Sequence, residues 1–355
     1  MRTIQSRSLY FVSVLAIVGL AILSNRLLKN SRFVAVPEAE AAVTLQGTGA
    51  TFPAPLYQKW FTEYNQAHPD VQINYQALGS GAGIKQFQQH LVDFGASDAA
   101  MTDEEIAAVP DGVVLLPMTA GAVVLAYNLP DVSQPLKLSR EAYVGIFLGK
   151  ITKWNDPAIA KANPGVTLPD TKIQPVVRSD GSGTTFVFTS HLSAISDAWK
   201  SGPGAGKSVN FPSAVAGKGN PGVAALIKET PGAIGYVEFG YAMQTHMPMA
   251  ILENKSGKYV KADLESGKAA LASVKLPDNL RAWITDPEAA DAYPIVTYTW
   301  LLCYKKYPDA QKWTTLKSVI QYGLKQGQSS SAELGYIPLP SSVIDADNKA
   351  LEQVS

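Results

Sequence analysis

The chain has 355 residues, with 30 basic and 30 acidic side chains and a formal net charge of zero. Its hydrophobic share of 46% is enough for a large core, which argues against disorder and favours two lobes. The balanced charge argues against a nucleic-acid partner, so an anion would have to be bound by local groups rather than by the overall field.

The first predicted element is an apolar segment, Leu9 to Leu23, which follows Arg2 and Arg7. It is short for a membrane span but suits a signal peptide. Ala39-Glu40-Ala41 fits a cleavage site, so we expect residues 1–41 to be a leader and the protein to be exported. An uncleaved anchor is the alternative, because three basic residues follow the apolar segment: Arg26, Lys29 and Arg32.

Strand and helix patterns then alternate, which predicts an α/β architecture. A helical spacing of apolar residues over 56–64 follows a glycine-containing turn, and the alternation over 71–75 predicts a strand. A glycine joint at residues 79–83 leads into another helical pattern. A short strand-like run then ends at Asp98, which therefore stands at a joint between two elements.

The same alternation continues to the end of the chain. Thr102 and Glu105 form a capping-box pattern for one helix, and Ser139 is the predicted cap of another. A strand over 172–177 precedes the loop that contains Arg178. Later elements are a return strand and a final helix, which we expect around Trp313, Leu316 and Ile320. The region 251–279 carries no motif and is expected to form surface elements.

The cysteine and histidine content gives no sign of a metal site. Cys303 is the only cysteine, so an internal disulfide is excluded, and its apolar neighbours predict a buried structural thiol. The four histidines are scattered, without the close spacing of a zinc site: His68, His90, His191 and His246. We therefore expect no metal and no cofactor.

Two glycine-serine joints in different halves of the chain suggest an anion site. Gly79-Ser80-Gly81 and Gly181-Ser182-Gly183 each precede an apolar helical pattern. Helix N-termini carry unpaired N–H groups and partial positive charge, so two such joints facing each other would surround an oxyanion. The second joint also has Arg178, a fork of donors that Asp180 could hold in place.

Each feature has a structural alternative when taken alone. A glycine-serine joint is commonly a turn with a cap, Asp98 could be a polar turn residue, and Phe52 could belong to the core. Arg178 and Asp180 could form a surface ion pair. We interpret "GKGNPG", residues 217–222, as capping chemistry at a helix start and leave it outside the site.

Enzyme motifs are not matched at the second joint. Ser182 is not in a G-x-S-x-G motif and has no base nearby in the sequence, so no nucleophile is indicated. The joint also lacks the lysine and the glycine spacing of a P-loop. Binding without catalysis is therefore the favoured reading, and no catalytic residue is assigned.

Seven segments together resemble the periplasmic phosphate-binding proteins of ABC importers. The resemblance runs from about Leu45 to Pro340, and its combination of motifs is more specific than any single loop. The segments are "GTGATFPAPLYQKW", "GSGAGIKQF", "DFGASDA", "FLGKITKWNDPAIAKANPG", "VVRSDGSGTTFVFTS", "GKGNPGVAAL" and "PGAIGYVEF".

This resemblance implies a two-lobed periplasmic binding-protein fold of type II, with phosphate enclosed in the cleft between lobes by hinge closure. It implies one lobe from residues 42–128 and 295–355 and another from 129–294. The phosphate-binding residues it implies are Thr51, Phe52, Ser80 and Asp98 in the first lobe and Arg178, Ser182, Gly183 and Thr184 in the second, with Asp180 supporting Arg178.

The implied function is high-affinity binding of inorganic phosphate and its delivery to the transmembrane subunits of an ABC permease, by a monomer that is not an enzyme. A phosphate sensor or a phosphate-ester hydrolase with a similar pocket is the alternative. The missing lipid-attachment cysteine after the leader departs from part of the family pattern and favours a free periplasmic protein.

Overall fold

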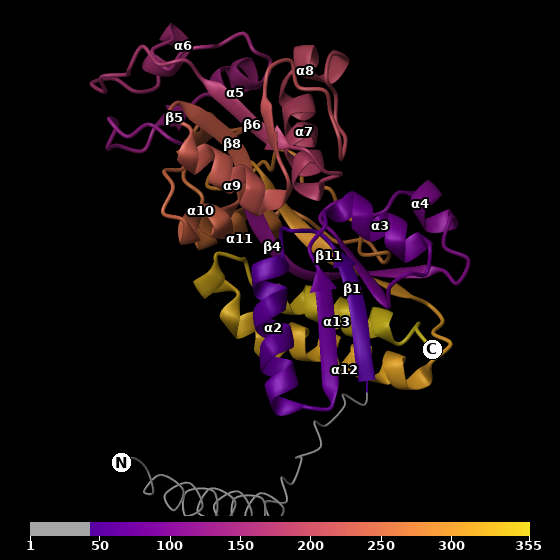
Figure 1. Cartoon of the computed structure of the whole chain (residues 1–355). Coiled ribbons are helices and arrows are strands. Elements are labelled where there is room, and N and C mark those ends of the chain that lie inside the picture. Colours follow the sequence, from indigo (N-terminus) through magenta and orange to yellow (C-terminus); the bar gives the residue numbers. More distant parts are fainter. Residues whose placement is uncertain (1–42) are drawn as a thin grey trace, which may run out of the picture. The chain divides into compact units, whose positions relative to one another are not determined.

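An eight-stranded mixed sheet runs through residues 43–355, which are the residues that the computed structural model describes (Figure 1). In order across the sheet the strands are β2 (Val71–Gln76), β1 (Val43–Gly49), β3 (Phe94–Ser97), β11 (Val296–Tyr304), β4 (Val113–Tyr127), β8 (Ala233–Glu238), β6 (Gln174–Arg178) and β7 (Val215–Gly217). The leader predicted for residues 1–41 lies outside the described residues.

Strand β4 joins two halves of this sheet. Its residues 113–122 pair antiparallel with β11, and its residues 123–127 pair antiparallel with β8. On one side β1 pairs parallel with β2 and β3, and on the other β6 pairs parallel with β7 and β8. All fifteen residues of β4 are buried, as expected for a strand covered on both faces. We call the two parts the first half-sheet, which contains β1, and the second half-sheet, which contains β6.

Helices from both ends of the described chain surround the first half-sheet (Figure 1). The apolar positions expected over residues 56–64 form the buried face of the first of these helices. The helices are α2 (Ala54–Ala67), α3 (Ser80–Gln88), α4 (Asp103–Ala107), α12 (Ala310–Leu324) and α13 (Ser341–Leu351), with 3-10 turns η1 (Gln326–Ser330) and η2 (Ala332–Leu334) between the last two.

The middle of the chain supplies the helices around the second half-sheet, one further helix, α11 (Leu264–Ala272), that packs against β11, and a small sheet of three strands. Its other helices are α5 (Arg140–Phe147), α6 (Pro157–Ala160), α7 (Gly183–Ile195), α8 (Asp197–Ser201), α9 (Gly219–Glu229) and α10 (Phe239–Gln244). The small sheet consists of β5 (Lys137–Leu138), β9 (Ile251–Glu253) and β10 (Tyr259–Val260). None of the helices in the described part of the chain is long and apolar enough to cross a membrane.

Most of the expected elements are confirmed. Thr102 and Glu105 form the predicted capping box of α4, and the Ser139 hydroxyl accepts a hydrogen bond from an N–H of α5. Cys303 is fully buried in β11, as expected for a structural thiol. One expectation is wrong: the helix around Trp313 does not end the fold, because α13 follows it and packs against β4.

Candidate anion-binding site

The first wall of the site is built where β3 ends and α3 begins. Asp98 directly follows β3 and is 2% exposed, and Ser80 is the first residue of α3. The Asp98 N–H donates to the Ser80 hydroxyl at 3.2 Å, and the Thr299 hydroxyl donates to Asp98 Oδ1 at 2.9 Å. These contacts hold the buried carboxyl group in one position beside the N-terminus of α3.

Thr51 and Phe52 form the turn between β1 and α2, on the same wall. Both residues are buried, and the Phe52 carbonyl accepts a hydrogen bond from the Tyr336 hydroxyl at 2.7 Å. The Phe52 ring fits against Gly121 of β4, where a Cβ atom would lie 2.8 Å from it. The turn is therefore fixed against the strand that joins the two half-sheets.

The opposite wall is built where β6 ends and α7 begins. Arg178, the last residue of β6, donates to both Asp180 oxygens, at 2.9 Å from Nε and 2.6 Å from Nη2. Its third nitrogen, Nη1, donates to the Thr184 hydroxyl at 3.2 Å. The Arg178 side chain is 1% exposed, so the surface ion pair considered as an alternative is wrong.

The N-terminus of α7 supplies hydrogen-bond donors on this wall. Ser182 is the N-cap residue, and its hydroxyl accepts the Thr185 N–H at 3.0 Å, which leaves the hydroxyl proton free to donate elsewhere. The N–H groups of Gly183 and Thr184 lie in the first turn, where a helix offers them no acceptor. Both residues are buried, so these N–H groups favour a bound anion.

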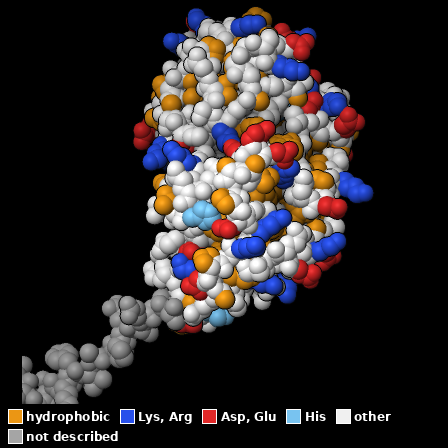
Figure 2. Space-filling model, turned by 90° about the vertical axis from the view of Figure 1, so that its right-hand side faces the viewer, with side chains coloured by type: hydrophobic (Ala, Val, Ile, Leu, Met, Phe, Trp, Pro, Cys, Tyr) orange, Lys and Arg blue, Asp and Glu red, His pale blue; other side chains and the backbone are white. Residues whose placement is uncertain are grey.

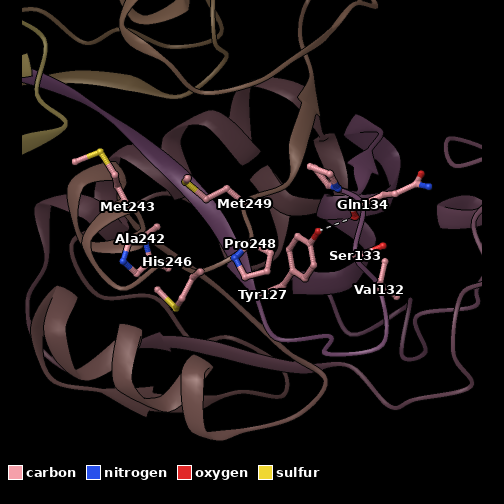
Figure 3. A pocket seen from close by; sticks show the side chains of 11 residues that line it. Tyr127, Val132, Ser133, Gln134, Ala242, Met243, His246, Pro248 and Met249 are labelled. Carbon is pink, nitrogen blue, oxygen red and sulfur yellow. Dashed lines mark hydrogen bonds between the residues drawn. The ribbon is translucent and has the colours of Figure 1, made fainter. Parts of the chain in front are cut away.

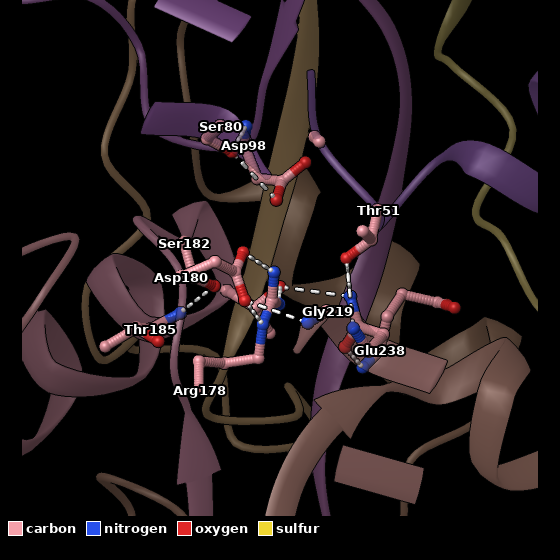
Figure 4. Close-up of polar contacts among 12 residues, drawn as sticks. Thr51, Ser80, Asp98, Arg178, Asp180, Ser182, Thr185, Gly219 and Glu238 are labelled. Atoms are coloured by element: carbon pink, nitrogen blue, oxygen red, sulfur yellow. Dashed lines mark hydrogen bonds and ion pairs between the residues drawn. The ribbon is translucent and has the colours of Figure 1, made fainter. Parts of the chain in front are cut away.

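The two walls are in direct contact. The Gly81 N–H donates to the Gly181 carbonyl at 2.8 Å, which joins the two glycine-serine joints through their backbones. A Cβ atom on Gly183 would lie 2.5 Å from the Ser80 hydroxyl and 2.7 Å from Asp98 Cβ. Only a glycine permits this approach, so the structure brings the predicted site residues of both halves of the chain together (Figure 4).

Two carboxyl groups of the site have opposite electrostatic properties. Burial raises the pKa of Asp98 to about 7, although hydrogen bonding by Thr299 and the charge of Arg178 oppose the shift. Burial would also raise the pKa of Asp180, but the hydrogen bonds and charge of Arg178 outweigh it and lower that pKa. Asp180 thus remains a carboxylate that neutralises and orients Arg178, whereas Asp98 exchanges a proton near neutral pH.

The charge on one face of the molecule is mixed. On the face shown in Figure 2, basic and acidic side chains are interspersed rather than gathered by sign. The buried guanidinium and the helix N-termini supply local positive charge at the site itself. One acceptor, Asp98, among several donors suits a tetrahedral oxyanion that carries a proton. The described residues contain no cluster of three or more histidine, cysteine or acidic side chains placed to hold a metal ion.

Asn220 belongs to this site although the sequence analysis placed it outside. The stretch does open helix α9, as expected, but Asn220 does not cap it: Lys218 occupies the N-cap position, and its side chain makes no capping hydrogen bond. The Asn220 amide instead donates to the hydroxyls of Thr51 at 3.0 Å and Thr184 at 3.3 Å, and so connects the two walls. The available signal was a third glycine-rich joint, residues 217–222, which precedes a helix as the other two do.

Thr299 and Gly219 are further contributors that the sequence did not indicate. Thr299 lies in the apolar run of β11, and 201 residues separate it from Asp98, so no local pattern connects them. The Gly219 N–H donates to Asp180 Oδ1 at 2.8 Å and completes the support of the Arg178 pair.

Comparison with known proteins identifies similar chains. Residues 35–324 match the protein family described as the PBP superfamily domain. Phosphate-binding protein PstS of Pasteurella multocida is 41% identical over 306 residues, which cover 85% of this chain and 88% of that protein. Phosphate-binding protein PstS of Methanocaldococcus jannaschii is 39% identical over 341 residues, which cover 89% and 88%.

A solved structure is similar in fold. A high-affinity periplasmic phosphate-binding protein (PfluDING), bound with phosphate, has a TM-score of 0.71 to this chain at 20% identity. The match covers 86% of this chain and 93% of that chain. At this identity the likeness concerns the fold, and it confirms the expected two-lobed α/β architecture.

Proposed function

The chain belongs to the PBP superfamily and, within it, to the phosphate-binding proteins, and from this membership we propose that it binds inorganic phosphate and delivers it to an ABC-type permease. The observation that carries the proposal is the buried Arg178 guanidinium, paired with Asp180 and placed beside the N-terminus of α7. A buried, charged donor beside free helix N–H groups favours a multiply charged oxyanion.

Each predicted residue has a role in this proposal. Arg178 donates to phosphate, and Asp180 orients it. Asp98 accepts a hydrogen bond from a protonated phosphate oxygen. The remaining donors are hydroxyl and main-chain N–H groups at three helix N-termini, contributed by Thr51, Phe52, Ser80, Ser182, Gly183 and Thr184.

We place one lobe at residues 42–128 and 295–355 and the other at 129–294. The support is that β4 and the segment leading into β11 carry the chain between the half-sheets. Phosphate would enter an open form and be enclosed as the lobes close about these two connections. The backbone hydrogen bond from Gly81 to Gly181 and the bonds from Asn220 to Thr51 would then form on closure.

The protein would act by binding and not by turnover. The Ser182 hydroxyl caps α7, and none of the hydrogen bonds among the described residues joins it to a histidine or a carboxylate. An activated nucleophile, which a phosphate-ester hydrolase needs, therefore lacks support. Export of a monomer to the periplasm, with cleavage of the leader, completes the proposal, and the signal-peptide pattern of residues 1–41 supports the export.

Calorimetric titration with inorganic phosphate tests this function. We expect one phosphate per chain, and an Arg178→Ala variant should bind more weakly by about 2–5 kcal/mol, because it loses a buried charged donor and leaves Asp180 unpaired. Arg178→Lys should restore affinity only in part, since lysine lacks the planar fork. Absence of phosphate binding by the unaltered protein would refute the function.

A matched control exists in the same part of the chain. Arg140 also forms a two-bonded pair with a carboxylate, donating to Asp286 at 2.8 and 2.7 Å, away from the site. Arg140→Ala should lower stability without changing phosphate affinity. An equal loss of affinity in both variants would show that ion-pair removal disturbs the fold rather than the site.

A further inference from the structure

One short stretch holds an unusual share of the soft ligand atoms of this chain. Three of the six methionines, Met243, Met247 and Met249, lie within seven residues, together with His246, one of the four histidines. The phosphate site uses none of them. Thioether sulfur and imidazole nitrogen are ligands of soft or borderline metal ions.

The backbone folds this stretch back on itself. Helix α10 ends at Gln244, and the His246 N–H donates to the Met243 carbonyl at 3.1 Å while the Met247 N–H donates to the Ala242 carbonyl at 3.0 Å. His246 has a φ of 54°, in the left-handed region that such helix ends require. Met249 then pairs with Ala126 of β4, so the whole stretch turns around one end of α10.

A pocket of about 390 Å³ opens at this turn. Figure 3 shows Met243, His246 and Met249 along one side and Val132, Ser133 and Gln134 along the other. Met247 also lines the pocket and is 6% exposed, whereas Met243 and Met249 are half-buried and His246 is exposed. Met243 and His246 therefore border open space, whereas Met247 belongs to the hydrophobic core and Met249 packs against it.

The residues that line the pocket favour soft metal ions over hard ones. No aspartate, glutamate, lysine or arginine is among the residues that line the pocket. Hard divalent cations such as Ca²⁺ and Mg²⁺ prefer charged oxygen ligands, which this lining does not offer. Neutral thioethers suit Cu(I), and each methionine has three rotatable bonds with which its sulfur can adjust to a common ligand.

We propose that this pocket is a binding site for one soft monovalent cation, Cu(I) or its redox-inert analogue Ag(I), held by the sulfurs of Met243, Met247 and Met249 and by the imidazole of His246. The exposed His246 provides the entry side. The buried Met247 provides the inner ligand. The site is separate from the phosphate site and needs no carboxylate.

Titration of the purified full chain with Ag(I) in chloride-free buffer tests the proposal. We expect one Ag(I) per chain. A Met243→Leu/Met247→Leu/Met249→Leu variant keeps the apolar volume but removes the sulfurs, so it should fold and bind phosphate normally. Its Ag(I) affinity should fall by at least roughly 100-fold, since even changes to groups behind metal ligands cost about 10–100-fold. X-ray absorption of the Cu(I) form should show sulfur neighbours.

Matched controls use the other soft atoms of the described chain. Met101 and Met118 are buried elsewhere, and Cys303 is a buried thiol. Met101→Leu/Met118→Leu and Cys303→Ser should leave Ag(I) binding unchanged. The proposal is overturned if the unaltered chain binds no Ag(I), if the triple leucine variant binds it equally well, or if Cys303→Ser alone abolishes binding.

Discussion

Asp98 is the residue on which discrimination between oxyanions depends. Its carboxyl group is buried, fixed by Ser80 and Thr299, and faces a space bounded by Arg178 and the N-terminus of α7 (Figure 4). As a carboxylate it accepts a hydrogen bond from a protonated phosphate oxygen but meets only lone pairs on sulfate. Two unit charges about 4 Å apart repel by roughly 1–4 kcal/mol between the dielectric limits of water and a protein surface.

The raised pKa of Asp98 makes this discrimination depend on pH. Below its pKa of about 7 the group is protonated and can donate to sulfate, whereas above that pH it repels sulfate. Sulfate does not titrate in this range, so a change in its affinity reports on the protein. We expect sulfate to bind more tightly at pH 6 than at pH 8 when measured by calorimetry.

An Asp98→Asn variant should bind sulfate better than the unaltered protein at pH 8 and lose this pH dependence, because the amide can donate at any pH. Asp93→Asn is the control, since Asp93 pairs with Lys312 outside the site. Equal sulfate affinity at both pH values in the unaltered protein would show that Asp98 is not the discriminating residue.

At the scale of elements, the site depends on how closely two helix starts approach each other. Gly183 begins α7, and its missing Cβ is what admits Ser80 and Asp98 from the other wall. We expect Gly183→Ala to weaken phosphate binding by about 1–3 kcal/mol through overpacking of the closed form. Calorimetry gives the affinity, and thermal unfolding without phosphate gives the stability.

Gly257 provides the contrasting variant. It lies in the turn between β9 and β10 with a φ of 78°, and nothing lies within 4 Å of the position a Cβ would take. Gly257→Ala should therefore cost about 1 kcal/mol of stability through backbone strain and leave phosphate affinity unchanged. A Gly183→Ala variant with normal phosphate affinity would contradict the close approach described here.

The sequence predicted those parts of the elements and of the site that depend on local pattern. Neighbouring glycines, hydroxyl residues and an apolar helical pattern mark the joints at Ser80 and Ser182, so the sequence predicted both joints. Asn220 and Thr299 act through contacts that span 169 and 201 residues, and nothing beside them in the sequence indicates those partners. The short strands β9 and β10 are likewise too brief for any periodicity to predict them.

At the scale of the whole molecule, buried carboxyl groups make stability depend on pH. Asp347 in α13 is completely buried, and neither of its oxygens has a hydrogen-bond partner among the described residues. Burial raises its pKa well above the ordinary value. Because the folded chain then holds a proton that the unfolded chain releases above about pH 4, Asp347 lowers the free energy of unfolding as pH rises.

Asp347→Asn should remove this contribution. Relative to the unaltered protein, the variant should gain stability as pH rises from 5, by at most about 1.4 kcal/mol per pH unit until the folded pKa is reached. The comparison cancels other groups, such as His191, whose burial lowers its pKa to about 4 and which acts in the opposite sense. Urea unfolding at several pH values measures the difference.

The exposed Asp345 on the same helix supplies the control, and Asp345→Asn should leave the pH dependence unaltered. If the free energy of unfolding varied with pH in the same way for the unaltered protein and for Asp347→Asn, the pKa of Asp347 would not be raised in the folded chain.

The position of β11 between β3 and β4 has a consequence for the order of folding. β11 is made long after its two neighbours, yet without it β3 and β4 have no partner strand between them and the first half-sheet remains divided. A chain that emerges N-terminus first therefore cannot complete this half-sheet until residue 304 has appeared. Such long-range pairing gives a high contact order and slow folding. A factor that binds the nascent chain can therefore act while most of the chain is being synthesised, before the native sheet closes.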